Sequence, residues 1–221
     1  MLSKQITMIT ILTKSNSIAN HYIAELRHIT IQQDRMKFRR NLERLGEIMA
    51  YEISKTFTYE QEDIETPLGI AEMHTLNEQP TLITIIRAGL PFHQGLLNVF
   101  DNADSGFIGA FRHTKKSGEF EIHKSYQSTP NLDDKIVIIS DPMLASGKSL
   151  VLCCKELLSQ YNIKELHIAA VIASEEGLQH VRAFLPEAHI WIGDVDKELT
   201  SKSYIVPGLG DAGDLAYGSK E

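Results

Sequence analysis

The stretch IVIISDPMLASGKSLVLC, residues 136–153, decides the fold class of this 221-residue chain. It opens with four consecutive β-branched residues, which are typical of a short strand buried on both faces of a sheet. The chain then turns through Asp141-Pro142, and apolar residues recur beyond this turn at helical spacing. We therefore predict a central strand that ends at Ser140 and a helix over 147–160.

The same alternation of strand, loop and helix runs along most of the chain. Apolar runs bounded by turn residues predict strands at 81–86, 106–111, 166–173 and 189–195, and an alternating run predicts an antiparallel strand at 119–126. Amphipathic spacing predicts helices over 17–30, 34–54 and 175–184, and a further helix with Pro91 in its first turn. A turn is predicted at Thr66-Pro67-Leu68-Gly69. This alternation indicates an α/β fold with a mainly parallel central sheet and helices on both faces, in a single domain over 1–221.

Ligands of such folds bind outside the carboxyl ends of the strands. The loops after Ile86, Phe111 and Ile139 are therefore the candidates here. Two of the strands end at an arginine, Arg87 and Arg112. Each could form a structural ion pair or bind a diphosphate, because a planar guanidinium group suits phosphate oxygens.

Gly147-Lys148-Ser149 invites comparison with a nucleotide phosphate loop, which needs a further glycine five residues before Gly147. Pro142 stands there, and proline lacks an N–H group, so the wide loop cannot form. A shorter anion cradle remains at the helix start, where backbone N–H groups over 145–149 and the hydroxyls of two serines can bind a phosphate. Asp141, just upstream, can accept hydrogen bonds from vicinal sugar hydroxyls, so a ribose 5-phosphate fits both halves.

Composition limits the classes of function. The net charge of −7 and the pI near 5.7 argue against broad nucleic-acid binding, although a local pocket can still bind a small anion. The opening 14 residues are too short to span a membrane, and we expect a cytoplasmic protein. Cys153 and Cys154 are interpreted as small core residues. The nine histidines show no metal-ligand spacing and are interpreted as ordinary residues, so no protein metal site is predicted.

The stretch from Asp141 to Ser149 resembles the phosphoribosyl-diphosphate (PRPP) loop of type I phosphoribosyltransferases, and its Asp-Pro pair is similar to the uracil phosphoribosyltransferase branch. The stretch YIVPGLGDAGD, residues 204–214, resembles the uracil-binding segment of that branch. Weaker similarities lie at 86–90, 111–112 and 65–69. The resemblance divides the chain into an N-terminal arm and helices (about 1–60), a core (about 80–195) and a base-binding segment (about 200–218).

The resemblance implies the reaction PRPP + uracil → UMP + diphosphate, with Mg²⁺ carried on PRPP, no nucleic-acid or membrane partner, and a homo-oligomer, dimer or tetramer. Asp141, Arg87 and Arg112 are its implied catalytic residues. The implied PRPP-binding residues are Arg87, Arg112, Asp141, Pro142, Met143, Leu144, Ala145, Ser146, Gly147, Lys148, Ser149 and Asp211. The implied uracil-binding residues are Ile205, Gly210, Asp211 and Ala212.

The chain departs from the family pattern at Lys148, where glycine is usual, at 113–116, where acidic residues are usual, and at Leu215, where a basic residue is usual. Lys148 could point to solvent or add charge near a phosphate. A second hypothesis is a PRPP- or nucleotide-sensing regulator on the same fold with little turnover.

Overall fold

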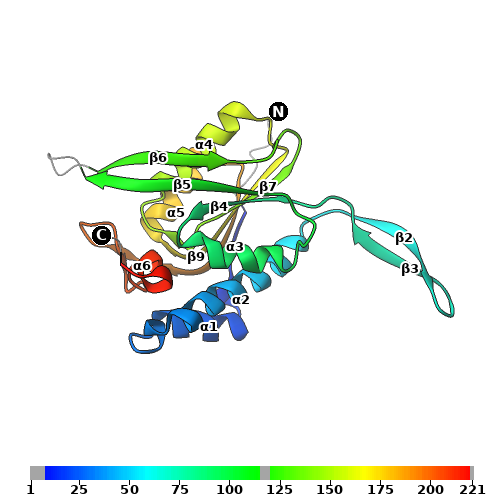
Figure 1. Ribbon diagram of the computed structural model, residues 1–221, viewed down its shortest axis with the longest axis horizontal. Helices are drawn as coiled ribbons and strands as arrows, with labels where there is room; N and C mark the ends of the chain where they lie inside the picture. The colour runs from blue at the N-terminus through cyan, green and yellow to red at the C-terminus, as the bar shows by residue number, and fades with distance from the viewer. Residues whose placement is uncertain (1–7, 115–119, 220–221) are drawn as a thin grey trace.

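A central sheet with the strand order β1-β10-β9-β7-β4-β5-β6 forms the body of the protein (Figure 1). The computed structural model describes residues 8–114 and 120–219. Every pairing along this path is parallel except that of β6, which runs antiparallel to β5. The strands are β1 (Ile9–Ile11), β4 (Thr81–Ile86), β5 (Ser105–Thr114), β6 (Phe120–Ser128), β7 (Ile136–Ser140), β9 (Glu165–Ser174) and β10 (His189–Asp196). The predicted parallel sheet with one antiparallel strand is confirmed.

Helices cover both faces of this sheet, as predicted. One core cluster joins the sheet to α1 (Ile18–Arg27), α2 (Arg35–Ser54), α3 (Gly89–Leu97) and α6 (Ala212–Tyr217). The other joins it to α4 (Lys148–Gln160) and α5 (Glu175–Phe184). All five residues of β7 are buried between the two layers, which explains the unbroken apolar run of its first four residues. Both cysteines are buried in α4, and burial raises the pKa of the Cys154 thiol.

Side-chain caps fix several helix ends close to their predicted positions. Ser17 forms a capping box with Asn20 at the start of α1, Asp34 caps α2, and Ser174 caps α5. The first helix ends at Arg27, earlier than the predicted residue 30, because His28 is extended. A short 3₁₀ turn, η2 (Ile31–Gln33), then leads into α2.

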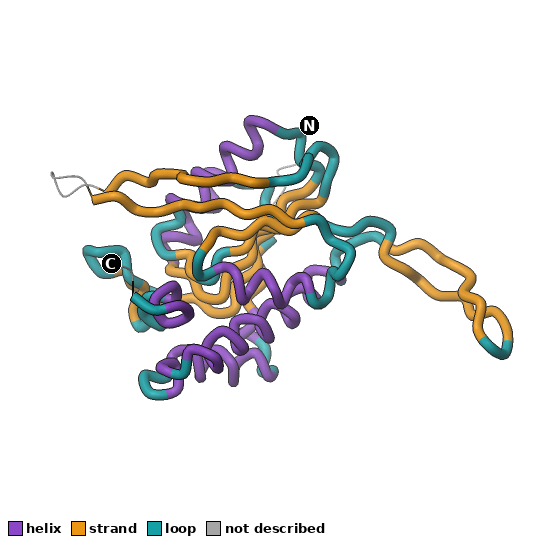
Figure 2. Tube along the Cα trace, viewed as in Figure 1, coloured by secondary structure: helices purple, strands orange, loops and turns teal. Residues whose placement is uncertain are grey.

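A two-stranded hairpin extends away from the body (Figures 1 and 2). It is made of β2 (Tyr59–Thr66) and β3 (Gly69–Leu76), and its tip is the predicted turn at 66–69. The two strands were not predicted, because neither has a buried face that would give an apolar alternation. Among the described residues, no helix is both long and apolar enough to cross a membrane.

Candidate functional site

The carboxyl ends of β4 and β7 are tied together by two side chains. The Thr84 hydroxyl donates to the carbonyl oxygen of Ser140 over 3.2 Å, and the Ser140 hydroxyl donates to that of Ile83 over 3.2 Å. The parallel register places Thr84 opposite Ser140. Arg87 and Asp141, which follow these two strands, therefore start from neighbouring points on the same edge of the sheet.

The predicted phosphate turn wraps the start of α4 and rests on α5. Gly147 adopts a left-handed conformation with φ of +71° immediately before α4, and no side chain caps that helix. A Cβ atom at Gly147 would lie 2.9 Å from the carbonyl oxygen of Gly177, and one at Gly177 would clash with that of Ala145. The Ser174 hydroxyl also donates to the Ala145 carbonyl over 2.6 Å. The turn is therefore held in one position by the first turn of α5.

The residues between Asp141 and the turn, 142–144, are hydrogen-bonded to the sheet and do not lie at the helix start. Met143 and Leu144 form a short strand, β8, that pairs with β9, and the Pro142 carbonyl accepts hydrogen bonds from two N–H groups of β9. The side chains of Pro142 and Leu144 are buried. The backbone N–H of Met143 donates to Asp141 Oδ1 over 3.3 Å. Of the predicted stretch, the residues that lie at the helix start are thus 145–149, and the Lys148 side chain there is exposed.

The predicted base-binding segment forms a compact turn beside the same edge. It enters through the small hairpin of β11 (Glu198–Leu199) and β12 (Ile205–Val206). Gly208 and Gly210 both have positive φ, +57° and +95°. The side chains of Ile205 and Ala212 are buried in the core, which leaves their backbone atoms as the groups available to a ligand.

Arg87 connects the sheet edge to this segment. Its guanidinium donates to Asp214 Oδ1 over 3.1 Å and lies 3.5 Å from the Gly218 carbonyl oxygen. Asp211 caps α6 by accepting from the N–H of Asp214 over 3.1 Å. The ion pair between Arg87 and Asp214, a partner that the sequence interpretation missed, is more than one third exposed on both sides.

Arg112 lies in β5, opposite Ile122 of β6. Its side chain lies outside the described residues, as do Lys115 and Lys116. The roles predicted for these residues stay predictions.

Comparison with known proteins identifies the family of this chain. The sequence profile described as "Uracil phosphoribosyltransferase" matches residues 12–219. The chain belongs to the uracil phosphoribosyltransferase family. A uracil phosphoribosyltransferase from Porphyromonas gingivalis is 50% identical over 206 residues, which cover 93% of this chain and 95% of that protein. One from Thermococcus gammatolerans is 40% identical over 191 residues, covering 84% of each chain.

A solved structure, the AQ2163 protein from Aquifex aeolicus, has a similar fold. It superposes with a TM-score of 0.85 at 36% identity, and the match covers 96% of this chain and 98% of that one. The resemblance seen in the two sequence motifs, 141–149 and 204–214, thus extends to a uracil phosphoribosyltransferase family match over nearly the whole chain.

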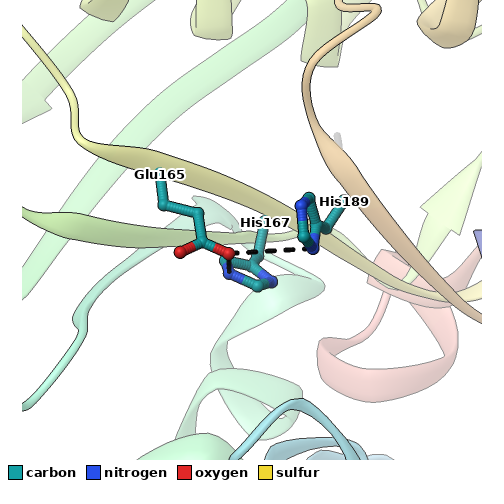
Figure 3. Close-up of side chains that lie close together, drawn as sticks. All are labelled: Glu165, His167 and His189. Atoms are coloured by element: carbon teal, nitrogen blue, oxygen red, sulfur yellow. Dashed lines mark ion pairs between the residues drawn. The ribbon is translucent and has the colours of Figure 1, made fainter. Parts of the chain in front are cut away.

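A separate polar cluster, Glu165, His167 and His189, lies at the opposite edge of the sheet, where β9 and β10 begin (Figure 3). The register pairs His189 with His167. Glu165 Oε1 lies 2.9 Å from His167 Nε2 and 3.7 Å from His189 Nδ1. The nearby His167 imidazole holds the pKa of Glu165 below its ordinary value. Interpreting the histidines as isolated residues missed this cluster, which forms only through the pairing of β9 with β10.

The indole of Trp191 makes this cluster unsuited to a metal ion. Its N–H donates to Nδ1 of the fully buried His167 over 3.0 Å, so the proton of the neutral imidazole sits on Nε2. A histidine that binds a metal through one ring nitrogen donates a hydrogen bond from the other, but here the other nitrogen faces a donor. A divalent ion on Nε2 would require an imidazolate. We therefore assign the cluster to packing and hydrogen bonding at this edge of the sheet.

Proposed function

We propose that this chain transfers ribose 5-phosphate from PRPP to N1 of uracil and releases UMP and diphosphate. One observation carries the proposal. The anion cradle at 145–149, the carboxylate of Asp141 and the turn at 205–212 lie at one edge of the sheet, and Arg87 bridges the edge to the last of these. Family membership supports the same reaction.

The 5-phosphate of PRPP would bind at the start of α4. The positive end of the helix dipole and the backbone N–H groups of 145–149 favour an anion there, and Gly147 allows its oxygens to approach the backbone closely. The Asp141 carboxylate would accept hydrogen bonds from the two ribose hydroxyls. Its negative charge would also favour the positive charge that develops on the ribose ring as the bond to diphosphate lengthens.

Uracil would bind against the backbone of the turn. Its edge presents an acceptor, a donor and an acceptor, and a tight turn offers N–H and C=O groups in alternation. We assign these contacts to Ile205, Gly210 and Ala212, with Asp211 towards the ribose. Cytosine would present a donor where uracil presents an acceptor, and unpaired buried groups would disfavour its binding.

The departing diphosphate needs positive charge. Arg87 follows β4 at the sheet edge and reaches the base-binding segment, and its partly exposed pairing with Asp214 allows it to exchange that partner for phosphate oxygens. We assign Arg112 to the same task. Mg²⁺ bound with PRPP would neutralise further charge on the diphosphate. This ion keeps most of its waters and needs few protein ligands. The carboxylates of Asp141 and Asp211 would suit such a hydrated ion. No protein nucleophile takes part, because orientation of uracil N1 toward the anomeric carbon accounts for the reaction.

We also propose that the protein works as a homo-oligomer. The β2–β3 hairpin carries Leu68, Ile70 and Met73 at exposed fractions of 100%, 73% and 52%, so its tip presents apolar surface that a second copy would cover. Light scattering coupled to size-exclusion chromatography would measure the mass, and a monomer would contradict this part of the proposal.

The activity is tested by assaying uracil, cytosine, hypoxanthine and orotate with PRPP and Mg²⁺. We expect turnover of uracil alone, and loss of turnover with excess EDTA that added Mg²⁺ restores. Asp141→Asn should lower kcat by more than it raises the KM for PRPP, whereas Asp101→Asn, in the exposed turn that follows α3, should change neither. Equal losses in both parameters would contradict the role of Asp141, and absence of uracil turnover in the unmodified protein would contradict the function itself.

A further inference from the structure

Arg27, the last residue of α1, is hydrogen-bonded to the backbone of the base-binding turn. Its guanidinium donates to the Gly208 carbonyl oxygen over 3.0 Å, to Asp194 over 2.7 Å, and to Asp196 over 2.7 and 3.0 Å. We infer that Arg27 is a positioning residue for uracil binding, an inference that rests on the proposed base site at 205–212. It would act through Gly208 without touching either substrate.

Asp196 also binds the backbone of Gly208. Its Oδ2 atom, which accepts from Arg27, also accepts the backbone N–H of Gly208 over 3.1 Å. The N–H and the C=O of Gly208 are thus both held by the Arg27–Asp196 ion pair. Gly208 cannot rotate its peptide groups without breaking a charge-assisted hydrogen bond, which is stronger than a neutral one.

The arrangement is charged and largely shielded from water. The side chains of Arg27 and Asp196 are 19% and 7% exposed. Burial disfavours the charged form of Arg27, but hydrogen bonds to Asp196 and Asp194 outweigh it and raise the pKa of the guanidinium. Asp194 is itself fixed by the Thr13 hydroxyl over 2.7 Å. Removing either partner would leave the other charge largely buried and uncompensated, so we expect the pair, and the turn bonded to it, to resist displacement.

This position matters for the base because the turn is tight. Gly208 has φ of +57°, and a Cβ atom there would clash with the Ile205 carbonyl oxygen, so the backbone of Gly208 packs directly on that of Ile205. Gly210 follows two residues later. A shift of Gly208 would therefore move the backbone groups on both sides of it that we assign to uracil. The PRPP turn at 145–149 rests on α5 instead and should be unaffected.

The test compares Arg27→Gln, Arg27→Lys and Asp194→Asn with the unmodified protein in the full forward reaction, varying uracil and PRPP separately. We expect Arg27→Gln to raise the KM for uracil at least tenfold and to change the KM for PRPP by less than threefold. Lysine lacks the planar fork that reaches two carboxylates and a carbonyl together, so Arg27→Lys should give an intermediate rise. Asp194→Asn leaves the contacts to Gly208 in place and should give the smallest rise.

Arg39→Gln is the matched control, because Arg39 donates over 2.7 Å to the Ala216 carbonyl, in the same C-terminal segment but away from the turn. We expect its KM for uracil to stay within twofold of the unmodified value. Three results would overturn the inference. The first is that Arg27→Gln raises the KM for uracil and the KM for PRPP equally, and the second is that it leaves the KM for uracil unchanged. The third is that Arg39→Gln raises the KM for uracil as much as Arg27→Gln does. If Arg27→Gln does not fold, the order expected of Arg27→Lys and Asp194→Asn decides it. An unmodified protein that does not use uracil would instead remove the proposed function.

Discussion

Lowering the pH from 7 to 5 should destabilise this protein through His93, a buried imidazole on α3. Nε2 of His93 lies 3.2 Å from the Ser105 hydroxyl, and the ring meets that of Phe107 edge-on. Nδ1 is buried without a hydrogen-bond partner among the described residues. Protonation would create an unpaired charged N–H group in this apolar site, so burial lowers the pKa of His93 to about 4.

The size of the effect follows from linkage between proton binding and folding. An unfolded histidine has a pKa of about 6.5, so between pH 6.5 and 4 the unfolded chain binds a proton that the folded chain excludes. The folded state is fully stable with respect to this group above that range and loses about 1.4 kcal/mol per pH unit within it. Between pH 7 and 5, His93 alone should therefore remove about 2 kcal/mol from the free energy of unfolding.

Urea unfolding at pH 7, 6 and 5 measures this loss in the unmodified protein and in His93→Gln, whose amide can still meet Ser105 but does not titrate. Burial, and then the neighbouring His167, also lower the pKa of His189, but that group is present in both proteins and its contribution cancels. We expect the unmodified protein to lose about 2 kcal/mol more than His93→Gln over this interval. The reasoning is refuted if both proteins lose the same free energy.

Two further substitutions test the packing of the site and of the opposite edge. Gly177→Ala would push a methyl group into the Ala145 carbonyl. We expect the free energy of unfolding, measured with urea, to fall by about 1–3 kcal/mol and the KM for PRPP to rise. An unchanged KM would show that the turn at 145–149 does not depend on its contact with α5. Trp191→Phe would leave Nδ1 of His167 buried without its donor, which should lower the free energy of unfolding by about 1–3 kcal/mol. We expect kcat to stay unchanged, because this cluster lies at the amino ends of the strands. A lowered kcat at full stability would contradict that assignment.

Local signals explain which elements could be predicted from the sequence. The run at 175–184 has both a helical period and a capping serine before it, and the predicted bounds are those of α5. The first four residues of β7 are apolar because helices cover the strand on both sides. The β2–β3 hairpin has no such signal. Its charged residues lie on both faces of the strands, and both faces are largely exposed to solvent, so only its turn could be identified.

The contacts that shape the site depend on residues far apart in the chain. Arg27 meets Asp196 across 169 positions, and Arg87 meets Asp214 across 127. Neither pair has a spacing that a sequence pattern could reveal. A signal did exist for the histidine cluster, because His167 and His189 begin neighbouring predicted strands. Knowing that β9 and β10 pair in this register would have been enough to place the two rings side by side.

The departures from the family pattern at Lys148 and Leu215 fall where side chains do not form the proposed contacts. Lys148 is exposed at the start of α4, so its backbone N–H can still face a phosphate while its side chain points to solvent. Leu215 packs against the core cluster beside Gly210. Because the phosphate cradle and the uracil turn that we propose would use backbone groups, changing these two side chains should leave both sites intact, provided that Gly147 and Gly208 keep their left-handed conformations.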